Sequence, residues 1–308
     1  MIHTGGTIGM GPGPAGIAPK EGLLEDALAA LSRRGLAGKT ALTTLRPLID
    51  SAHATPADWN RIGQTIEAGH GAHQGFVVTH GTDTMAFTGA ALAMALEGLG
   101  RPVVLTGAML PLGQPGSDGP GNLADAVLAA RSAPAGLWLQ FGGKLLHGAR
   151  LRKHSSTAAE AFVAVPGAAP PLRPGAALRR HPFGTARLAI LTVAPGGSGA
   201  AIGAALDHLD GAVLRVFGAG TLPNDPELAR ALHRAQARGT LMLAVSQCAE
   251  GGLSPGAYAA GSLMEEAGIL PGADMTAEAA YAKLALALSL PEDQRRALLA
   301  QNLCGEMA

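Results

Sequence analysis

Residues 75–84 read Gly-Phe-Val-Val-Thr-His-Gly-Thr-Asp-Thr, an apolar run followed at once by polar residues. A short continuous apolar run is typical of a strand buried on both faces, as in a parallel sheet. Outward from this stretch, the pattern predicts strands at 40–46, 75–79, 102–106 and 136–141 and helices at 21–33, 56–69, 83–97 and 121–131. This alternation predicts an α/β fold with a mostly parallel sheet and helices on both faces.

A proline-rich segment interrupts the alternation. It has no sustained periodicity, which is typical of an irregular connection, and it contains Pro166, Pro170, Pro171, Pro174 and Pro182. The pattern then restarts with strands at 187–193, 212–217 and 240–246 and helices at 199–208, 226–238, 276–289 and 292–301. We therefore expect a larger N-terminal α/β domain at 1–170, a linker at 171–186 and a smaller C-terminal α/β domain at 187–308.

The composition bounds the class of protein. The chain has 308 residues, 47% of them hydrophobic, and Lys plus Arg balance Asp plus Glu at 23 each. A nucleic-acid-binding protein normally carries a basic surplus, so no nucleic-acid partner is expected. The neighbouring basic residues Arg150, Arg152 and Lys153 are still compatible with a small basic patch on the surface. No apolar run approaches the roughly 18 residues of a membrane span, and the first residues lack a signal-peptide pattern. We expect a cytoplasmic protein without membrane contact.

The sequence points to no metal or cofactor. Cys248 and Cys304 lie far apart and are expected to be reduced, buried thiols. His70 and His73 are three residues apart, but nothing near them in the sequence completes a ligand set.

Polar residues follow the predicted strands at the points where each strand ends. Because ligands bind at the carboxyl ends of parallel strands, we expect these residues at one edge of the sheet: 4–7, 50–51, 79–84, 107–119 and 152–154. Each signal is ambiguous by itself. Helix N-capping explains Thr82 or Asp83 as well as a functional role does, His80 is more often structural, and Lys153 fits a solvated surface position.

Two motifs carry a resemblance to a known family. Residues 4–10 (Thr-Gly-Gly-Thr-Ile-Gly-Met) and 79–85 (Thr-His-Gly-Thr-Asp-Thr-Met) resemble the two signature motifs of bacterial L-asparaginases. Further stretches are similar to the cytoplasmic type I branch, in the right order along the whole chain: 50–51, 105–108, 117–119, 272–276 and 301–303.

The resemblance implies a mechanism and a set of site residues. It implies hydrolysis of the side-chain amide of L-asparagine to L-aspartate and ammonia through an acyl-enzyme, with Thr7 as nucleophile and Thr82, Asp83 and Lys153 as a second catalytic group. It does not decide which threonine is acylated. Substrate contacts are implied at Ser51, Asp83, Ala52 and Ala108, and backbone amides near Thr82 and in 107–118 are candidates for oxyanion stabilisation.

The chain departs from the family pattern at three positions. Ile17 stands where the family usually places a lid tyrosine that assists the nucleophile, Ala52 replaces a frequent glutamine, and Thr221 replaces a frequent asparagine. The loss of the phenol predicts weaker or redistributed activation of Thr7, and the segment Gly9–Gly16 is expected to act as a flexible lid.

The resemblance also implies a homodimer or homotetramer, with the C-terminal domain contributing to subunit contacts. Arg215 and Cys248 lie in segments that resemble a second, regulatory asparagine site. Three alternatives stay open at this stage: a glutamine-preferring amidohydrolase of the same fold, because one methylene changes pocket fit only about 10–200-fold; an amidotransferase subunit; and a catalytically weak amino-acid-binding homologue.

Overall fold

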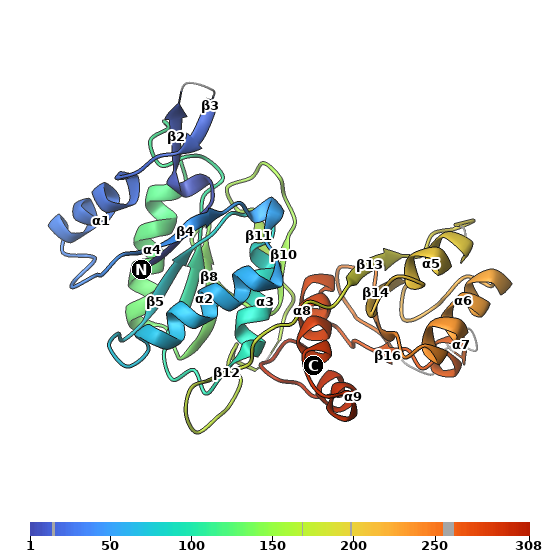
Figure 1. The fold of residues 1–308 in the computed structure, drawn as a ribbon. Helices are drawn as coiled ribbons and strands as arrows, with labels where there is room; N and C mark the ends of the chain where they lie inside the picture. The colour runs from blue at the N-terminus through green and yellow to red at the C-terminus, as the bar shows by residue number, and fades with distance from the viewer. Residues whose placement is uncertain (14–15, 168, 198, 255–261) are drawn as a thin grey trace.

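The computed structural model describes residues 1–13, 16–167, 169–197, 199–254 and 262–308. They form two α/β units that lie side by side, with the N-terminus in the larger unit and the C-terminus near the junction (Figure 1). The predicted fold class is confirmed.

The larger unit is built on a six-stranded sheet of order β4-β1-β5-β7-β8-β9. Its strands are β1 (Ile2–Gly5), β4 (Thr43–Ile49), β5 (Phe76–Thr79), β7 (Pro102–Thr106), β8 (Gly136–Phe141) and β9 (Lys144–His147). Only β9 runs antiparallel to its neighbour. Because Thr79 of β5 lies opposite Thr106 of β7, these two strands end level with each other and bring the loops that follow them to one edge.

Helices cover both faces of this sheet. On one face, α1 (Leu23–Arg33) and α4 (Gly119–Ser132) pack in a cluster with Val77 and Val104; on the other, α2 (Pro56–Gly69) and α3 (Met85–Ala95) pack with Val78 and Val103. α3 is buried nearly all round because it lies between the sheet and α8. A helix that is apolar on every side belongs in such an interior position.

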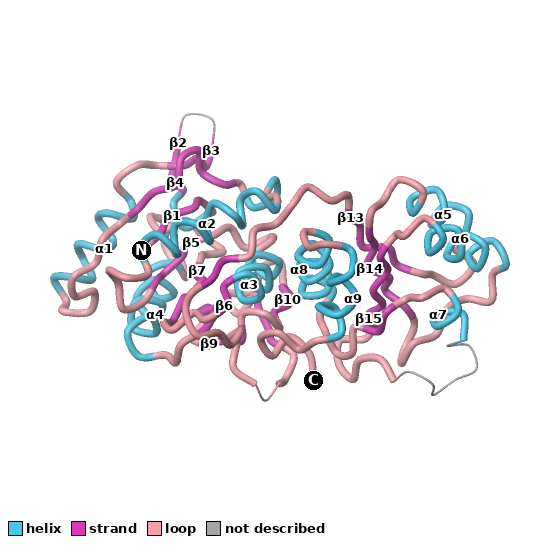
Figure 2. The backbone as a smooth tube through the Cα atoms, turned by 60° about the horizontal axis from the view of Figure 1, so that its bottom comes forward, coloured by secondary structure: helices cyan, strands magenta, loops and turns pink. Residues whose placement is uncertain are grey.

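The smaller unit has a four-stranded parallel sheet of order β13-β14-β15-β16. Its elements are β13 (Leu188–Thr192), α5 (Gly199–Leu206), β14 (Gly211–Val216), α6 (Pro226–Ala237), β15 (Leu241–Ser246), α7 (Ser262–Glu266), β16 (Leu270–Pro271), α8 (Ala277–Leu288) and α9 (Glu292–Ala300). α8 contacts both β13–β15 and α3, so this helix joins the two units (Figure 2).

Several short elements were not predicted from the sequence. They are the hairpin β2 (Met10–Gly13) and β3 (Gly16–Pro19), the pair β6 (Leu96–Glu97) and β12 (Arg179–Arg180), and the ribbon β10 (Leu151–Lys153) and β11 (Phe162–Ala164). The predicted helix 83–97 is shorter than expected because Leu96 and Glu97 leave it to pair with β12. The predicted strand 40–46 begins three residues later, at Thr43.

Three expectations about individual side chains and spans have outcomes in the structure. Cys304 is buried as expected, but Cys248 is exposed, so the prediction for that residue was wrong. The basic patch does not form, because the side chain of Arg150 is 1% exposed and ion-paired with Asp274. Within the described part of the chain, no helix is long and apolar enough to cross a membrane.

Candidate active site

Two glycine turns touch each other at the carboxyl edge of the larger sheet. Gly5 and Gly6 adopt φ values of 131° and 87°, a region that favours glycine. A Cβ on Gly6 would lie 2.5 Å from the backbone nitrogen of Gly81, so the two backbones are in direct contact. Thr7 follows the first turn and Thr82 follows the second, so this contact joins the two segments that carry the threonines.

Ser51 lies against the same pair of turns. A Cβ on Gly81 would lie 2.3 Å from Ser51 Oγ, and Thr84 Oγ1 donates a 2.8 Å hydrogen bond to the Ser51 carbonyl. Ser51 is buried, and Ala52, which follows it, is exposed. Three loops that are distant in the sequence therefore meet at this point, and they carry Thr7, Ser51 and Thr82.

Lys153 reaches this cluster from the β10–β11 ribbon. Its Nζ donates hydrogen bonds of 2.9 Å to Thr82 Oγ1 and 2.8 Å to Asp83 Oδ1. The Lys153 side chain is 21% exposed, whereas that of Asp83 is 62% exposed. Asp83 thus holds the amine with one oxygen and keeps much of its carboxylate accessible to a cationic group of a ligand.

The loop after β7 is held by Asp118. Its carboxylate accepts hydrogen bonds from the backbone nitrogens of Met109 and Leu110 at 2.9 and 3.0 Å and from Asn122 Nδ2 at 3.0 Å. Asn122 also donates to the Gly107 carbonyl. Sequence reasoning missed Asn122, although its position four residues after Asp118 on a helix was a usable signal. Ala108 is buried as a whole residue, and its methyl packs in the core.

His80 is a structural residue. Its Nδ1 donates to the Gly81 carbonyl at 2.7 Å, and its Nε2 lies 3.0 Å from Thr88 Oγ1, which in turn accepts from Trp59 Nε1. Both ring nitrogens are occupied, with the tautomer assigned from these partners. Burial lowers the pKa of His80, so the ring is neutral near pH 7 and supports the loop rather than acting as a base.

The remaining residues singled out from the sequence lie away from this cluster or at its margin. Ile17 is 54% exposed on the β2–β3 hairpin, opposite Pro12. Arg215 donates to the carbonyl of Gln247, the neighbour of Cys248. Thr221 pairs with Phe217 in a tight turn. In the described residues, no group of three or more His, Cys, Asp or Glu side chains is placed to hold a metal ion.

Taken together, the cluster offers hydroxyl groups that can attack a carbonyl carbon, an amine beside one of them, and a carboxylate that is 62% exposed although it pairs with that amine. These are the functional groups that an amidohydrolase needs when a side-chain hydroxyl acts as its nucleophile. The models of two protein-family domains match this chain, "Asparaginase, N-terminal" over residues 1–173 and "Glutaminase/Asparaginase C-terminal domain" over residues 187–297. The chain belongs to the asparaginase family.

Relatives of known name cover the whole chain. L-asparaginase 1 of Escherichia coli K12 is 35% identical over 328 residues, which span 100% of this chain and 97% of that protein. The crystal structure of L-asparaginase I from Vibrio cholerae matches with a TM-score of 0.87 and 33% identity, covering 100% of this chain and 98% of that one. The thermostable L-asparaginase from Thermococcus kodakarensis matches with a TM-score of 0.84 and 29% identity over 100% and 98%.

Proposed function

We propose that this protein is an L-asparaginase that hydrolyses L-asparagine to L-aspartate and ammonia. One observation carries the assignment of residues: Lys153 Nζ bonds to both Thr82 and Asp83 at the point where the Thr7 turn meets the Thr82 loop. The named relatives that cover the whole chain support the choice of substrate.

The zwitterionic end of the substrate is bound by two groups. Ser51 Oγ donates to the α-carboxylate, and the accessible oxygen of Asp83 accepts from the α-ammonium. Charge-assisted hydrogen bonds of this kind fix the register of a small ligand, so the side-chain amide is presented to the threonines. Ala52 and the backbone at Ala108 complete the wall around the substrate.

Thr7 is the nucleophile in this proposal. Its Oγ1 forms a bond to the amide carbon while its proton leaves the hydroxyl, and the carbonyl π electrons move onto oxygen. Backbone N–H groups near Thr82 stabilise that oxyanion. When the oxyanion collapses, the C–N bond breaks, the nitrogen takes up a proton and ammonia leaves. Water then attacks the ester of Thr7, releasing aspartate and restoring the hydroxyl. The Thr82–Lys153–Asp83 group relays protons in both halves of the reaction.

Ammonia release from asparagine tests the assignment. Thr7→Ala, Thr82→Ala and Lys153→Met should each lower kcat by at least about 100-fold, the scale of general acid–base or nucleophilic catalysis. Lys144→Met is the matched lysine control, because the Lys144 side chain is 56% exposed and, among the described residues, forms its ion pair with Glu160; its kcat should stay unchanged. Wild-type activity on asparagine that survives Thr7→Ala would overturn the role given to Thr7.

Rapid acid quenching followed by peptide mass spectrometry identifies the acylated residue. The aspartyl adduct should appear on the peptide that contains Thr7, and an adduct on the peptide that contains Thr82 would exchange the two roles. Specificity constants for asparagine and glutamine separate the proposal from a glutamine-preferring enzyme. Binding of asparagine without any ammonia release would indicate the catalytically weak binding homologue.

We further propose a cytoplasmic homodimer or homotetramer and a domain division at 1–170, 171–186 and 187–308. The named relatives support an enzyme that acts on a small molecule, and the oligomer is what the family resemblance implies. Light scattering on the purified protein measures the oligomer, and a monomer of 30.8 kDa would contradict the proposal. Limited proteolysis should cut first within 171–186, where the described backbone is irregular apart from β12.

A further inference from the structure

Lys153 is carried by a short element that lies outside the six-stranded sheet. β10 and β11 form a separate two-stranded ribbon, with Lys153 opposite Phe162 at its far end. An isolated two-stranded ribbon is marginally stable. Leu151 and Phe162 pack this ribbon into the main core. The position of the amine therefore depends on that packing and on what fixes the ribbon at its base.

Arg150, the residue before β10, is bonded on every side. Its Nε donates to the Val165 carbonyl at 2.8 Å, and its Nη2 donates to the Pro166 carbonyl at 2.6 Å and forms an ion pair with Asp274. Its Nη1 donates to the Gly305 carbonyl at 3.2 Å. The guanidinium thus ties both strands of the ribbon to the loop before α8 and to the last residues of the chain.

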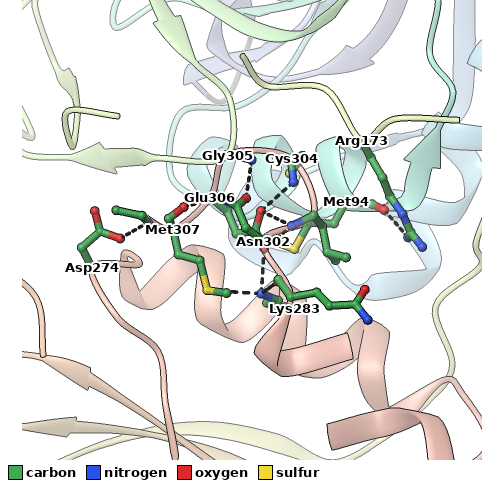
Figure 3. A network of polar contacts seen from close by, with 12 residues as sticks. Met94, Arg173, Asp274, Lys283, Asn302, Cys304, Gly305, Glu306 and Met307 are labelled. Carbon is green, nitrogen blue, oxygen red and sulfur yellow. Dashed lines mark hydrogen bonds and ion pairs between the residues drawn. The ribbon is translucent and has the colours of Figure 1, made fainter. Parts of the chain in front are cut away.

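The segment 301–308 is itself fixed by buried charge. Lys283 of α8 and Glu306 are both fully buried and form an ion pair of 2.7 Å, and the Glu306 carboxylate also accepts from the backbone nitrogens of Leu303 and Cys304. Figure 3 shows these groups drawn together around Asn302, with Asp274 beside Met307. Arg150 is therefore anchored to a rigid partner rather than to a loose end.

Strand alternation links this anchor to the amine. Successive side chains of a strand point to opposite faces, so Leu151 and Lys153 share one face of β10. Leu151 is buried against Gly89 of α3, where a Cβ would lie 3.1 Å from Leu151 Cδ1. Lys153 meets Thr82 and Asp83 just before the start of the same helix. A shift of β10 by one residue along β11, about 3.3 Å, would move the Lys153 amine out of hydrogen-bonding distance of both Thr82 and Asp83.

We infer that Arg150 is a positioning residue that fixes the register of β10, and with it the place of the Lys153 amine, by clamping the ribbon to Asp274 and the 301–308 segment. This inference rests on the catalytic role proposed for Lys153. Gly167 supports this inference. A Cβ at that residue would lie 2.7 Å from Arg150 Nε, so the absence of a side chain at Gly167 leaves space for the guanidinium where it is observed.

Arg150→Lys tests the inference, since lysine keeps the charge but cannot reach four acceptors in a planar fork. A misplacement of about 1 Å can cost on the order of 100-fold in rate; we expect kcat to fall about 10- to 100-fold with KM for asparagine within about 3-fold. The pH dependence of kcat should also shift, because a displaced amine weakens the hydrogen-bonded proton relay through Thr82. Gly167→Ala, which leaves Arg150 intact, should lower kcat in the same direction.

Arg173→Lys is the matched control. Arg173 is also an arginine of low exposure, 15%, bonded to the Met94 carbonyl and Glu97, but it does not contact β10 in any described hydrogen bond. Its variant should lose comparable thermal stability and keep the wild-type kcat and pH profile. If both arginine variants lose kcat in proportion to stability, with unchanged pH profiles, Arg150 has only a structural role and the inference is wrong.

Lys153→Met, assayed in parallel, separates the two levels of the argument. If it retains the wild-type kcat, the proposed role of Lys153 fails. If it is inactive while Arg150→Lys and Gly167→Ala keep full kcat, only the positioning role fails.

Discussion

Removing one member of the buried pair Lys283–Glu306 should destabilise the protein far more than removing both. Both side chains are 0% exposed and lie 2.7 Å apart. Lys283→Met leaves the carboxylate of Glu306 buried without a cation, and Glu306→Gln leaves the ammonium without an anion. Breaking a buried pair from one side costs about 3–5 kcal/mol, whereas replacing both charges is often nearly neutral.

The two single variants should respond to pH in opposite directions. In the wild type, burial opposes ionisation of Glu306, but the charge of Lys283 and backbone hydrogen bonds outweigh it and lower its pKa. That contribution to stability is therefore complete above about pH 4.3 and is lost as the pH falls through the folded-state pKa. Without Lys283, burial raises the carboxyl pKa, so the cost of Lys283→Met should grow from pH 5 to pH 8. The cost of Glu306→Gln should shrink over the same range, because a buried lone amine can release its proton.

Urea and thermal unfolding at pH 5 and pH 8 measure both effects. Each single variant should lower Tm by roughly 5–10 °C at its unfavourable pH, and the double variant by much less than the sum. The resulting coupling energy should be at least about 3 kcal/mol, because the double variant escapes the cost of the unfavourable single variant. Additive losses, or single variants with the same pH trend, would refute the reasoning.

Three further predictions concern the lid, acid stability and substrate binding. Ile17→Tyr should raise kcat several-fold by supplying a phenol to the nucleophile, and unchanged turnover would show that none was missing. Burial lowers the pKa of His147 to about 4, and the charge of Arg150 contributes second. The free energy of unfolding should therefore fall by up to about 3 kcal/mol as the pH drops from about 6.5 to about 4. His147→Gln should reduce the accompanying fall in Tm, and an equal fall in the variant would contradict the prediction. Gly81→Ala should displace Ser51 and raise KM at least about 10-fold, whereas Gly71→Ala, with open space around its Cβ, should leave KM unchanged.

Apolar periodicity was sufficient to predict the main strands and helices. The runs at 76–79 and 102–106 are central strands of the sheet, and their short length and β-branched residues favoured a strand over a buried helix. The short pairs β6–β12 and β10–β11 were missed because two or three residues carry no measurable period. Their paired residues are also distant in the sequence, 82 or 84 residues apart in β6–β12 and 9 to 13 residues apart in β10–β11. Such pairings are decided by tertiary contacts rather than by local preference.

The candidate site shows the same division. The sequence order of loops predicts that residues following parallel strands gather at one edge, which is how Thr7 and Thr82 were placed there. The function of Arg150 was not visible in the sequence: beside Arg152 and Lys153 it resembled a surface patch, and only the fold reveals the carbonyls that surround it. No pattern in the neighbouring sequence indicates that an arginine will be buried among backbone carbonyl groups.

The backbone contact between Gly6 and Gly81 also affects how the enzyme should fail. The turns at Gly6 and Gly81 pack directly on each other, so neither can move without exposing the other to solvent. Separation of β1 from β5 should therefore displace the proposed nucleophile and the proton relay in the same event. A sample inactivated by mild heating should therefore contain fully active and inactive molecules, without a population of reduced kcat. Active-site titration would then give an unchanged turnover number per surviving site.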